Sequence, residues 1–249
     1  MFTSAVQDIN GYGVNCSWGC NGAISINNVT GGSGSPTTYS FDGGITFGQV
    51  WTTSGLCPAD YYLAVKDASG CITRDTVSII APDSLVLSLD SKQDISCNNG
   101  SDGFINISVN GGTPNYTYSW FNDDGFFSSD EDISQIAGGT YTVNVVDGNF
   151  CETSLSVEIG ENEAMSIETT IDECVNNNGT ITVSAFGGQP DYLFELISEN
   201  IIIQTNSNGI FNQVQSGDYV IIAYDALNCD VQESLIINSA PQADFILDE

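Results

Sequence analysis

The chain has 249 residues, of which 32 are acidic and three are basic, and its formal net charge is −29. Nucleic-acid backbones and anionic lipid surfaces are bound through clustered Lys and Arg, so this balance argues against both as partners. No stretch approaches the roughly 20 apolar residues of a membrane-spanning helix, and we expect no direct membrane insertion. Only 14% of the residues are charged, and the Asn, Ser, Thr and Gly that supply the remaining polar surface favour turns and strands.

In chain order, the first recurring element is a pair of glycines. It stands at residues 31–32, 111–112 and 187–188. The second is a strand that begins near a tyrosine and ends at an aspartate, with a cysteine after the turn. It reads ADYYLAVKDASGC at 59–71, GTYTVNVVDGNFC at 139–151 and GDYVIIAYDALNC at 217–229. We predict that its tyrosines are core residues and that its aspartates form turns by accepting backbone N–H bonds. These are Tyr61, Tyr141 and Tyr219, and Asp67, Asp147 and Asp225.

The spacing of these elements predicts three repeats of about 80 residues. We place their boundaries at 1–81, 82–160 and 161–240, and expect residues 241–249 to begin a further repeat. Pro82 and Pro241 occupy equivalent positions at the junctions and restrict the backbone there.

The middle repeat shows the strand pattern most clearly. Alternating or β-branched runs occur at 84–90, 103–110, 116–121 and 153–159, besides the tyrosine-led strand. No segment has a helical period with caps. The sequence therefore predicts an all-β chain, a tandem array of three immunoglobulin-like β-sandwich repeats with Gly- and Asn-rich turns.

Eight cysteines and no histidine favour disulfides over metal ligation, since no CxxC pair occurs either. The second and third repeats each hold one cysteine before the second strand and one after the tyrosine-led strand. We therefore predict the bridges Cys97–Cys151 and Cys174–Cys229, each stabilising its repeat by roughly 4 kcal/mol in the chain-entropy model. Disulfides imply an oxidising, extracytoplasmic setting.

The first repeat holds four cysteines, and their pairing is open. Aligning Gly22 with Gly103 places Cys16 on Cys97, which predicts Cys16–Cys71 and leaves Cys20–Cys57 by elimination. These two bridges conflict with each other. Cys57 precedes the tyrosine-led strand and Cys71 follows it, so Cys57 and Cys71 should lie towards opposite ends of the sandwich, whereas Cys16 and Cys20 are only four residues apart. The alternatives are Cys20–Cys71 with Cys16–Cys57, or a distorted first repeat.

The segment SWFNDDGFFSSDED, residues 119–132, is a candidate ligand or calcium loop. Aromatic faces can stack on a sugar ring, and carboxylates are ligands that Ca²⁺ prefers. Its candidate residues are Trp120, Phe121, Phe126 and Phe127, with Asp123, Asp124, Asp130, Glu131 and Asp132. The loop lacks EF-hand spacing, and the alternative is a turn with one or two aromatics folded into the core. Apart from this Ca²⁺, no cofactor is expected.

Catalysis is not expected. The absence of histidine excludes Ser-His-Asp and Cys-His arrangements, and the cysteines are better explained as bridges. A carboxylate pair could hydrolyse glycosides, but Asp and Glu are so frequent here that any pair is uninformative. We therefore predict no catalytic residues.

Two stretches of the middle repeat resemble a known family. CNNGSDGFINISVNGGTPNYTYSW, followed by EDISQIAGGTYTVNVVDGNFC, is similar to the SprB repeat of cell-surface gliding adhesins and other giant secreted proteins of the Bacteroidota. The resemblance is close in the middle repeat, moderate in the third and weaker in the first, where GGSGSPTTYSFDGG keeps the turn. It implies export by type IX secretion, an extracellular, outer-membrane-attached location, and a role in adhesion or gliding motility.

We therefore expect a non-catalytic stalk of a long cell-surface adhesin filament. Its expected partners are neighbouring repeats of the same long chain, with surface polysaccharide or the motility machinery as further candidates. The alternative is a carbohydrate-binding module array of a secreted enzyme.

Overall fold

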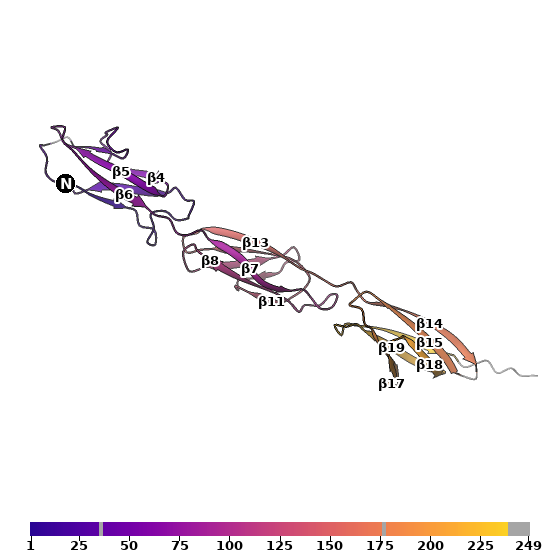
Figure 1. The fold of residues 1–249 in the computed structure, drawn as a ribbon. Coiled ribbons are helices and arrows are strands. Elements are labelled where there is room, and N and C mark those ends of the chain that lie inside the picture. The colour runs from indigo at the N-terminus through magenta and orange to yellow at the C-terminus, as the bar shows by residue number, and fades with distance from the viewer. Residues whose placement is uncertain (35–36, 176–177, 239–249) are drawn as a thin grey trace, which may run out of the picture. The chain divides into compact units, whose positions relative to one another are not determined.

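The structure, a computed structural model, describes residues 1–34, 37–175 and 178–238, and no side chains for residues 173–175. These residues form twenty β-strands (Figure 1). Within the described part of the chain no helix could cross a membrane. The expected further repeat at 241–249, with Pro241, lies outside the described residues.

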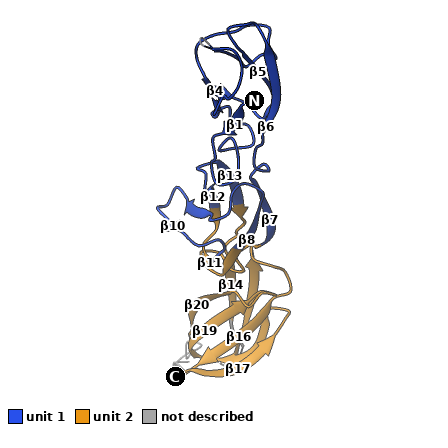
Figure 2. Cartoon of the chain, turned by 90° about the vertical axis from the view of Figure 1, so that its left-hand side faces the viewer, with its two compact units in different colours: residues 1–91, 105–133, 140–157 blue, residues 92–104, 134–139, 158–249 orange. Residues whose placement is uncertain are grey.

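The chain divides into two compact units (Figure 2). Unit 1 comprises residues 1–91, 105–133 and 140–157, and unit 2 comprises residues 92–104, 134–139 and 158–249. The first predicted repeat thus lies wholly in unit 1 and the third wholly in unit 2. The residues of the middle repeat are divided between the two units.

The first repeat consists of two three-stranded sheets. One has the order β1-β2-β4 and the other β3-β5-β6. Their strands are β1 (Thr3–Val6), β2 (Gly22–Asn27), β3 (Thr38–Ser40), β4 (Thr52–Leu56), β5 (Ala59–Lys66) and β6 (Ile72–Ile79). Ile24 and Ile26 of β2 share one buried cluster with Leu63 and Val65 of β5. The hydrophobic core therefore lies between the two sheets, as in a β-sandwich.

The middle repeat has a three-stranded and a four-stranded sheet. Their orders are β11-β8-β7 and β10-β9-β12-β13. Their strands are β7 (Val86–Gln93), β8 (Gly103–Asn110), β9 (Thr117–Phe121), β10 (Phe127–Ser128), β11 (Ile133–Ile136), β12 (Gly139–Val146) and β13 (Glu152–Ile159). Tyr141, Val143 and Val145 of β12 are buried, as the alternation predicts.

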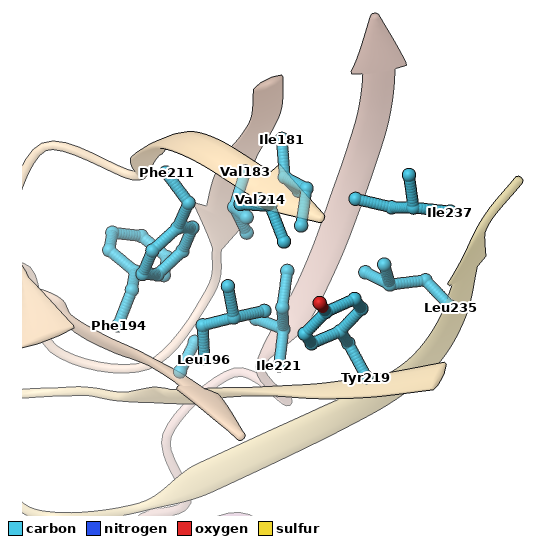
Figure 3. Close-up of a cluster of buried hydrophobic side chains, with 11 residues drawn as sticks. Ile181, Val183, Phe194, Leu196, Phe211, Val214, Tyr219, Ile221, Leu235 and Ile237 are labelled. Carbon is cyan, nitrogen blue, oxygen red and sulfur yellow. The ribbon is translucent and has the colours of Figure 1, made fainter. Parts of the chain in front are cut away.

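The third repeat repeats this plan with the orders β14-β15-β18 and β17-β16-β19-β20. Its strands are β14 (Ser166–Val175), β15 (Asn178–Phe186), β16 (Leu193–Ser198), β17 (Ile201–Asn206), β18 (Ile210–Gln215), β19 (Gly217–Tyr224) and β20 (Asp230–Ile237). Ile181 and Val183 of β15 lie in one buried cluster with Tyr219 and Ile221 of β19 (Figure 3). The two sheets again enclose the core.

The predicted fold class is confirmed: the chain is an all-β tandem array of immunoglobulin-like sandwiches. The expectation of a core tyrosine is confirmed for Tyr141 and Tyr219, which are buried. Tyr61 is half-buried and packs against the core cluster of the first repeat. Its hydroxyl donates a hydrogen bond to the Cys57 carbonyl at 2.9 Å, and the Tyr219 hydroxyl donates to Gln215 at 3.0 Å in the same relative position. This tyrosine thus also anchors the segment four residues before it.

Candidate functional site: cysteine bridges at the aspartate turns

Each tyrosine-led strand ends in a turn built on its aspartate. The turns run from Asp67 to Cys71, from Asp147 to Cys151 and from Asp225 to Cys229. In each, the carboxylate accepts a hydrogen bond from the cysteine N–H, at 2.9, 2.8 and 2.9 Å respectively. The aspartate N–H donates back to the cysteine carbonyl at 3.0, 2.9 and 3.0 Å. The predicted role of these aspartates as turn-formers is confirmed.

The segment of the glycine pair provides a further hydrogen bond to the carboxylate of each aspartate. The residue after the pair donates its backbone N–H to the second carboxylate oxygen. These donors are Ser33, Thr113 and Gln189, at 3.1, 2.8 and 2.9 Å. Gly112 and Gly188 have φ values of +61° and +62°, and a Cβ on them would lie 2.7 and 2.6 Å from the Oδ2 of Asp147 and Asp225. Only glycine lets the backbone approach the carboxylate this closely.

The carboxylate of Asp67 is held in its charged form. A hydrogen bond from the Ser69 side chain, followed by the backbone N–H groups of Ser33 and Cys71, lowers the pKa of Asp67 to about 2. Hydrogen bonds to the ionised form favour it, which is the cause of the shift.

Two disulfides connect such a turn to a loop of the preceding repeat. Cys16 is bonded to Cys151 with a Cα–Cα distance of 5.7 Å, and Cys97 is bonded to Cys229 at 5.4 Å. The first bridge lies within unit 1 and the second within unit 2. Each joins the cysteine before the second strand of one repeat to the cysteine after the tyrosine-led strand of the next.

The predicted bridges Cys97–Cys151 and Cys174–Cys229 are therefore wrong. In the third repeat, Gly217 pairs with Ile237 at one end of β19 and β20, and Tyr224 pairs with Asp230 at the other end, next to Cys229. The ends of β14 and β15 next to Cys174 lie at the Ile237 end, because Val175 pairs with Asn178 and a Cβ on Gly179 would meet the Ile237 side chain at 3.5 Å. Seven residue steps of about 3.3 Å separate these ends by about 23 Å, whereas bridged cysteines need Cα atoms within about 7 Å. The side chain of Cys174 itself lies outside the described residues.

The first repeat has one internal bridge, Cys20–Cys57. This pairing was predicted by elimination and is confirmed. The predicted Cys16–Cys71 bridge is wrong, as is the alternative of Cys20–Cys71 with Cys16–Cys57, because Cys16 pairs with Cys151. Within the described residues Cys71 has no disulfide partner and is exposed.

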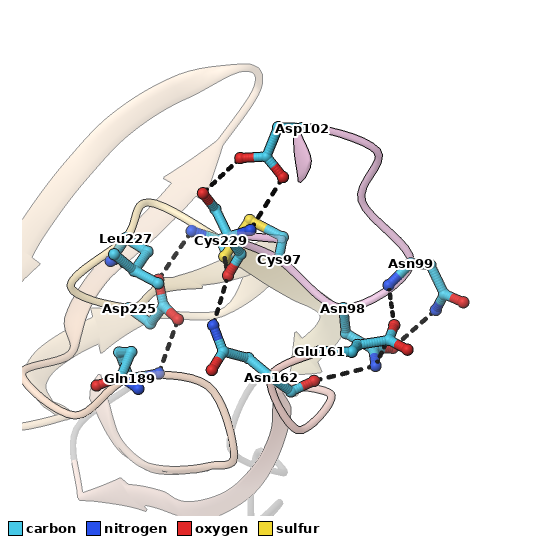
Figure 4. The surroundings of a disulfide bond; sticks show 11 residues. Cys97, Asn98, Asn99, Asp102, Glu161, Asn162, Gln189, Asp225, Leu227 and Cys229 are labelled. Carbon is cyan, nitrogen blue, oxygen red and sulfur yellow. Dashed lines mark hydrogen bonds between the residues drawn. A yellow bond between two sulfur atoms is a disulfide. The ribbon is translucent and has the colours of Figure 1, made fainter. Parts of the chain in front are cut away.

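Polar contacts surround the Cys97–Cys229 bridge (Figure 4). The side-chain amide of Asn162 donates to the Ser96 carbonyl at 2.8 Å, and that of Asn98 donates to Glu161 Oε1 at 2.9 Å. The N–H of Ser96 donates to Asp102 at 2.9 Å, and the hydrogen bonds from Ser96, led by its hydroxyl, lower the pKa of Asp102. The loop that carries Cys97 is thus fixed on both sides of the cysteine.

The Cys16–Cys151 bridge has its own polar contacts. The side-chain amide of Asn149 donates to the Asn15 carbonyl at 3.3 Å, and Asn10 donates to the side-chain oxygen of Asn149 at 2.5 Å. The residue before the loop cysteine has the same role at both bridges: the Sγ of Cys151 lies 3.3 Å from the Asn15 carbonyl oxygen, and that of Cys229 lies 3.4 Å from the Ser96 oxygen. Sequence reasoning missed these loop contacts, for which the only signal is that both cysteines recur with the period.

The candidate ligand loop at 119–132 is split between core and surface. Trp120 is fully buried, and its indole N–H donates to the carbonyls of Asp130 and Glu131 at 3.1 and 3.2 Å. Phe126 packs edge-on against Tyr141 with ring centroids 5.2 Å apart. Phe127 is 70% exposed.

The acidic residues of this loop are not gathered into a cation site. Asp123 and Asp124 are exposed, Asp130 accepts a hydrogen bond from Ser128, and Asp132 accepts one from the Ile107 N–H at 2.9 Å. Among the described residues, no three Asp, Glu or Cys side chains are grouped so that they could hold a metal ion. Calcium binding by this loop stays a prediction.

The fold and the bridged turns define a class of protein, a tandem immunoglobulin-like repeat module. Within it, residues 89–125 and 167–199 match the SprB repeat family. The resemblance drawn from the sequence is confirmed in these two regions, which lie in the predicted middle and third repeats.

Two solved structures are similar to the chain at low sequence identity. The three N-terminal domains of the bacteriophage RB49 highly immunogenic outer capsid protein are 15% identical and have a TM-score of 0.43, with 96% of each chain covered. The N-terminal eight immunoglobulin domains of Down syndrome cell adhesion molecule are 11% identical, with a TM-score of 0.39, over 83% of this chain and 33% of that one. No curated protein sequence matches the chain.

Proposed function

We propose that the chain is a non-catalytic repeat segment of a long cell-surface adhesin filament that serves adhesion or gliding motility. The observation that carries the proposal is the pair of disulfides that join successive repeats, Cys16–Cys151 and Cys97–Cys229. A bridge inside a repeat stabilises that repeat alone. A bridge from one repeat to the next adds a covalent link at each junction, which suits a filament that must stay intact under tension.

The same disulfides bear on the location of the protein. Disulfides persist in oxidising compartments, which supports an extracellular place for this chain. Outer-membrane attachment, type IX secretion and contact with surface polysaccharide or the motility machinery belong to the proposal through the match to SprB repeats. The net charge of −29 adds solubility and leaves Ca²⁺ as a candidate ligand of the acidic surface.

One observation favours the alternative, a carbohydrate-binding module array of a secreted enzyme. Phe127 of β10 pairs directly with Phe121 of β9, and both rings are exposed. Cross-strand neighbours share one face of a sheet, so the two rings offer an apolar surface on which a sugar could stack. The variant Phe127→Ala should abolish retention on a polysaccharide column if this alternative holds.

The proposal is tested on intact cells of the source organism. Antibodies against residues 1–249 should label unpermeabilised cells, and deletion of the gene should reduce surface attachment or gliding while leaving secreted glycosidase activity unchanged. Label that enters only permeabilised cells, or a loss of glycosidase activity with normal attachment, would overturn it.

A further inference from the structure

The turn of the first repeat has the construction of a bridged turn but carries no bridge. Asp67 accepts hydrogen bonds from the N–H groups of Cys71 and Ser33, as Asp147 and Asp225 do from their counterparts. Yet Cys71 is exposed, and no partner for it occurs among the residues that the structure describes. The turn is therefore already in the conformation that two other turns of this chain adopt when a cysteine loop is attached.

Burial separates the bridged turns from the unbridged one. Cys151 and Cys229 are 5% and 8% exposed, and Asp147 and Asp225 are both 4% exposed. In contrast Asp67 is only half-buried. The same local hydrogen bonds occur in all three turns, so the additional burial tracks the presence of the attached loop.

A hollow lies at the corresponding place in the first repeat. It is lined by Gly31, Gly32, Asp67 and Cys71, which are the glycine pair, the aspartate and the cysteine of this turn. In the third repeat, a hollow lined by Gly188, Asp225 and Cys229 is also lined by Cys97 and Asn98 of the attached loop. The two surfaces thus share the same components, and in the third repeat the loop occupies one side.

We propose that the Cys71 turn is a docking surface for the cysteine loop of another repeat of the same kind. The residue before the loop cysteine would place its carbonyl oxygen against the sulfur of Cys71, as Asn15 and Ser96 do at the two existing bridges. Two bridged examples within the same chain carry this inference, and it does not depend on the adhesin proposal.

The covalent step is a disulfide exchange with a donor disulfide, which can be a protein or a small molecule. The Cys71 thiolate attacks one sulfur of the donor, and the donor's other sulfur leaves as a thiolate. The loop cysteine then attacks the mixed disulfide as its own thiolate and displaces the donor's second thiol. The two cysteines are oxidised to one disulfide and the donor is reduced to two thiols, so the electrons balance.

The test uses the full chain carrying Cys174→Ser and a peptide of residues 92–104, KQDISCNNGSDGF. The reference peptide has the same residues in reversed order. Each peptide competes with glutathione to form a mixed disulfide with Cys71. Mass spectrometry of the intact protein gives the fraction bonded to the peptide and the fraction bonded to glutathione. We expect the loop peptide to be favoured over the reversed peptide by about tenfold or more, because it alone presents the hydrogen-bonding groups in the correct order.

A matched variant separates docking from simple exposure. Cys71→Ser combined with Thr76→Cys moves the thiol to an exposed position on β6, away from the aspartate turn. This variant should show no preference between the two peptides. The proposal would be overturned if the loop peptide and the reversed peptide gave equal peptide-to-glutathione ratios at Cys71. It would also be overturned if the Thr76→Cys variant favoured the loop peptide as strongly as Cys71 does.

Discussion

At the scale of single residues, each turn is organised by hydrogen bonds to its aspartate. Asp147 is buried, and its carboxylate accepts three backbone N–H bonds, from Thr113, Asn149 and Cys151, each at 2.8 Å. A buried carboxylate is stable only when such charge-assisted bonds replace its water. The turn therefore depends on Gly112, which lets the Thr113 N–H reach the carboxylate.

The first prediction concerns this glycine. Gly112→Ala should destabilise the chain by about 2 kcal/mol more than Gly125→Ala. Both positions have positive φ, so both substitutions strain the backbone, but only at Gly112 would the new Cβ meet Asp147. Urea unfolding of the two variants measures the difference, and equal losses would contradict the close approach.

The second prediction concerns the charge on Asp67, whose pKa is lowered to about 2. A lowered carboxyl pKa contributes stability that is fully present above its unfolded value of about 3.9 and is lost as the pH falls through the folded value. Asp67→Asn removes the charge at every pH. The difference in melting temperature between the native chain and Asp67→Asn should therefore be largest at pH 7 and disappear towards pH 2.

Melting curves from pH 7 to pH 2 at constant ionic strength check this prediction. Comparing the two chains at each pH cancels the general effect of protonating the other acidic residues. A difference that stays constant across this range would show that the Asp67 charge contributes nothing.

At the scale of elements, alternation along the tyrosine-led strands decides which face is buried. In β19, Tyr219, Ile221 and Ala223 are buried. The sequence was sufficient to place this strand, which is bounded by glycine and aspartate, but residues 219–224 are all hydrophobic, so the buried face follows from the packing of the sheet. It was not sufficient for residues 119–132, where four aromatics are close in sequence. Their distribution between core and surface depends on the β9–β10 hairpin, which buries Trp120 and exposes Phe127.

The third prediction tests this alternation. Ile221→Ala should cost about 3 kcal/mol of unfolding free energy, because Ile221 is fully buried between the sheets of the third repeat. Ile236→Ala on the neighbouring β20 should change stability by less than about 0.5 kcal/mol, because Ile236 is 61% exposed. Chemical denaturation gives both values, and similar costs would mean that the faces are assigned wrongly.

At the scale of the whole molecule, the net charge of −29 opposes compact folding by self-repulsion. The fourth prediction is that NaCl raises the melting temperature, because salt screens this repulsion. Ca²⁺ at matched ionic strength should raise it further if the acidic surface binds the ion. Equal shifts would leave screening alone and remove Ca²⁺ as a candidate ligand, and no shift with NaCl would contradict the role of self-repulsion.

The period in the sequence predicts the repeats and relates their cysteines to one another, but it could not predict which cysteines are bonded. Cys97 and Cys229 recur with the repeat, and a bridge within each repeat leaves the same spacing as a bridge to the next one. The distinction depends on which end of the sandwich each cysteine occupies. In the first repeat, Cys57 precedes β5 and Cys71 follows it, so these two cysteines lie towards opposite ends of the sandwich. The strands are too long for a bridge to span the sandwich, and the bridges therefore join successive repeats.

The most direct test of these bridges is peptide mapping of the unreduced chain after proteolysis with free thiols blocked. We predict peptides that link Cys16 to Cys151, Cys97 to Cys229 and Cys20 to Cys57, with Cys71 carrying the blocking group. Recovery of Cys97 linked to Cys151, or of Cys174 linked to Cys229, would contradict the covalent connection of successive repeats.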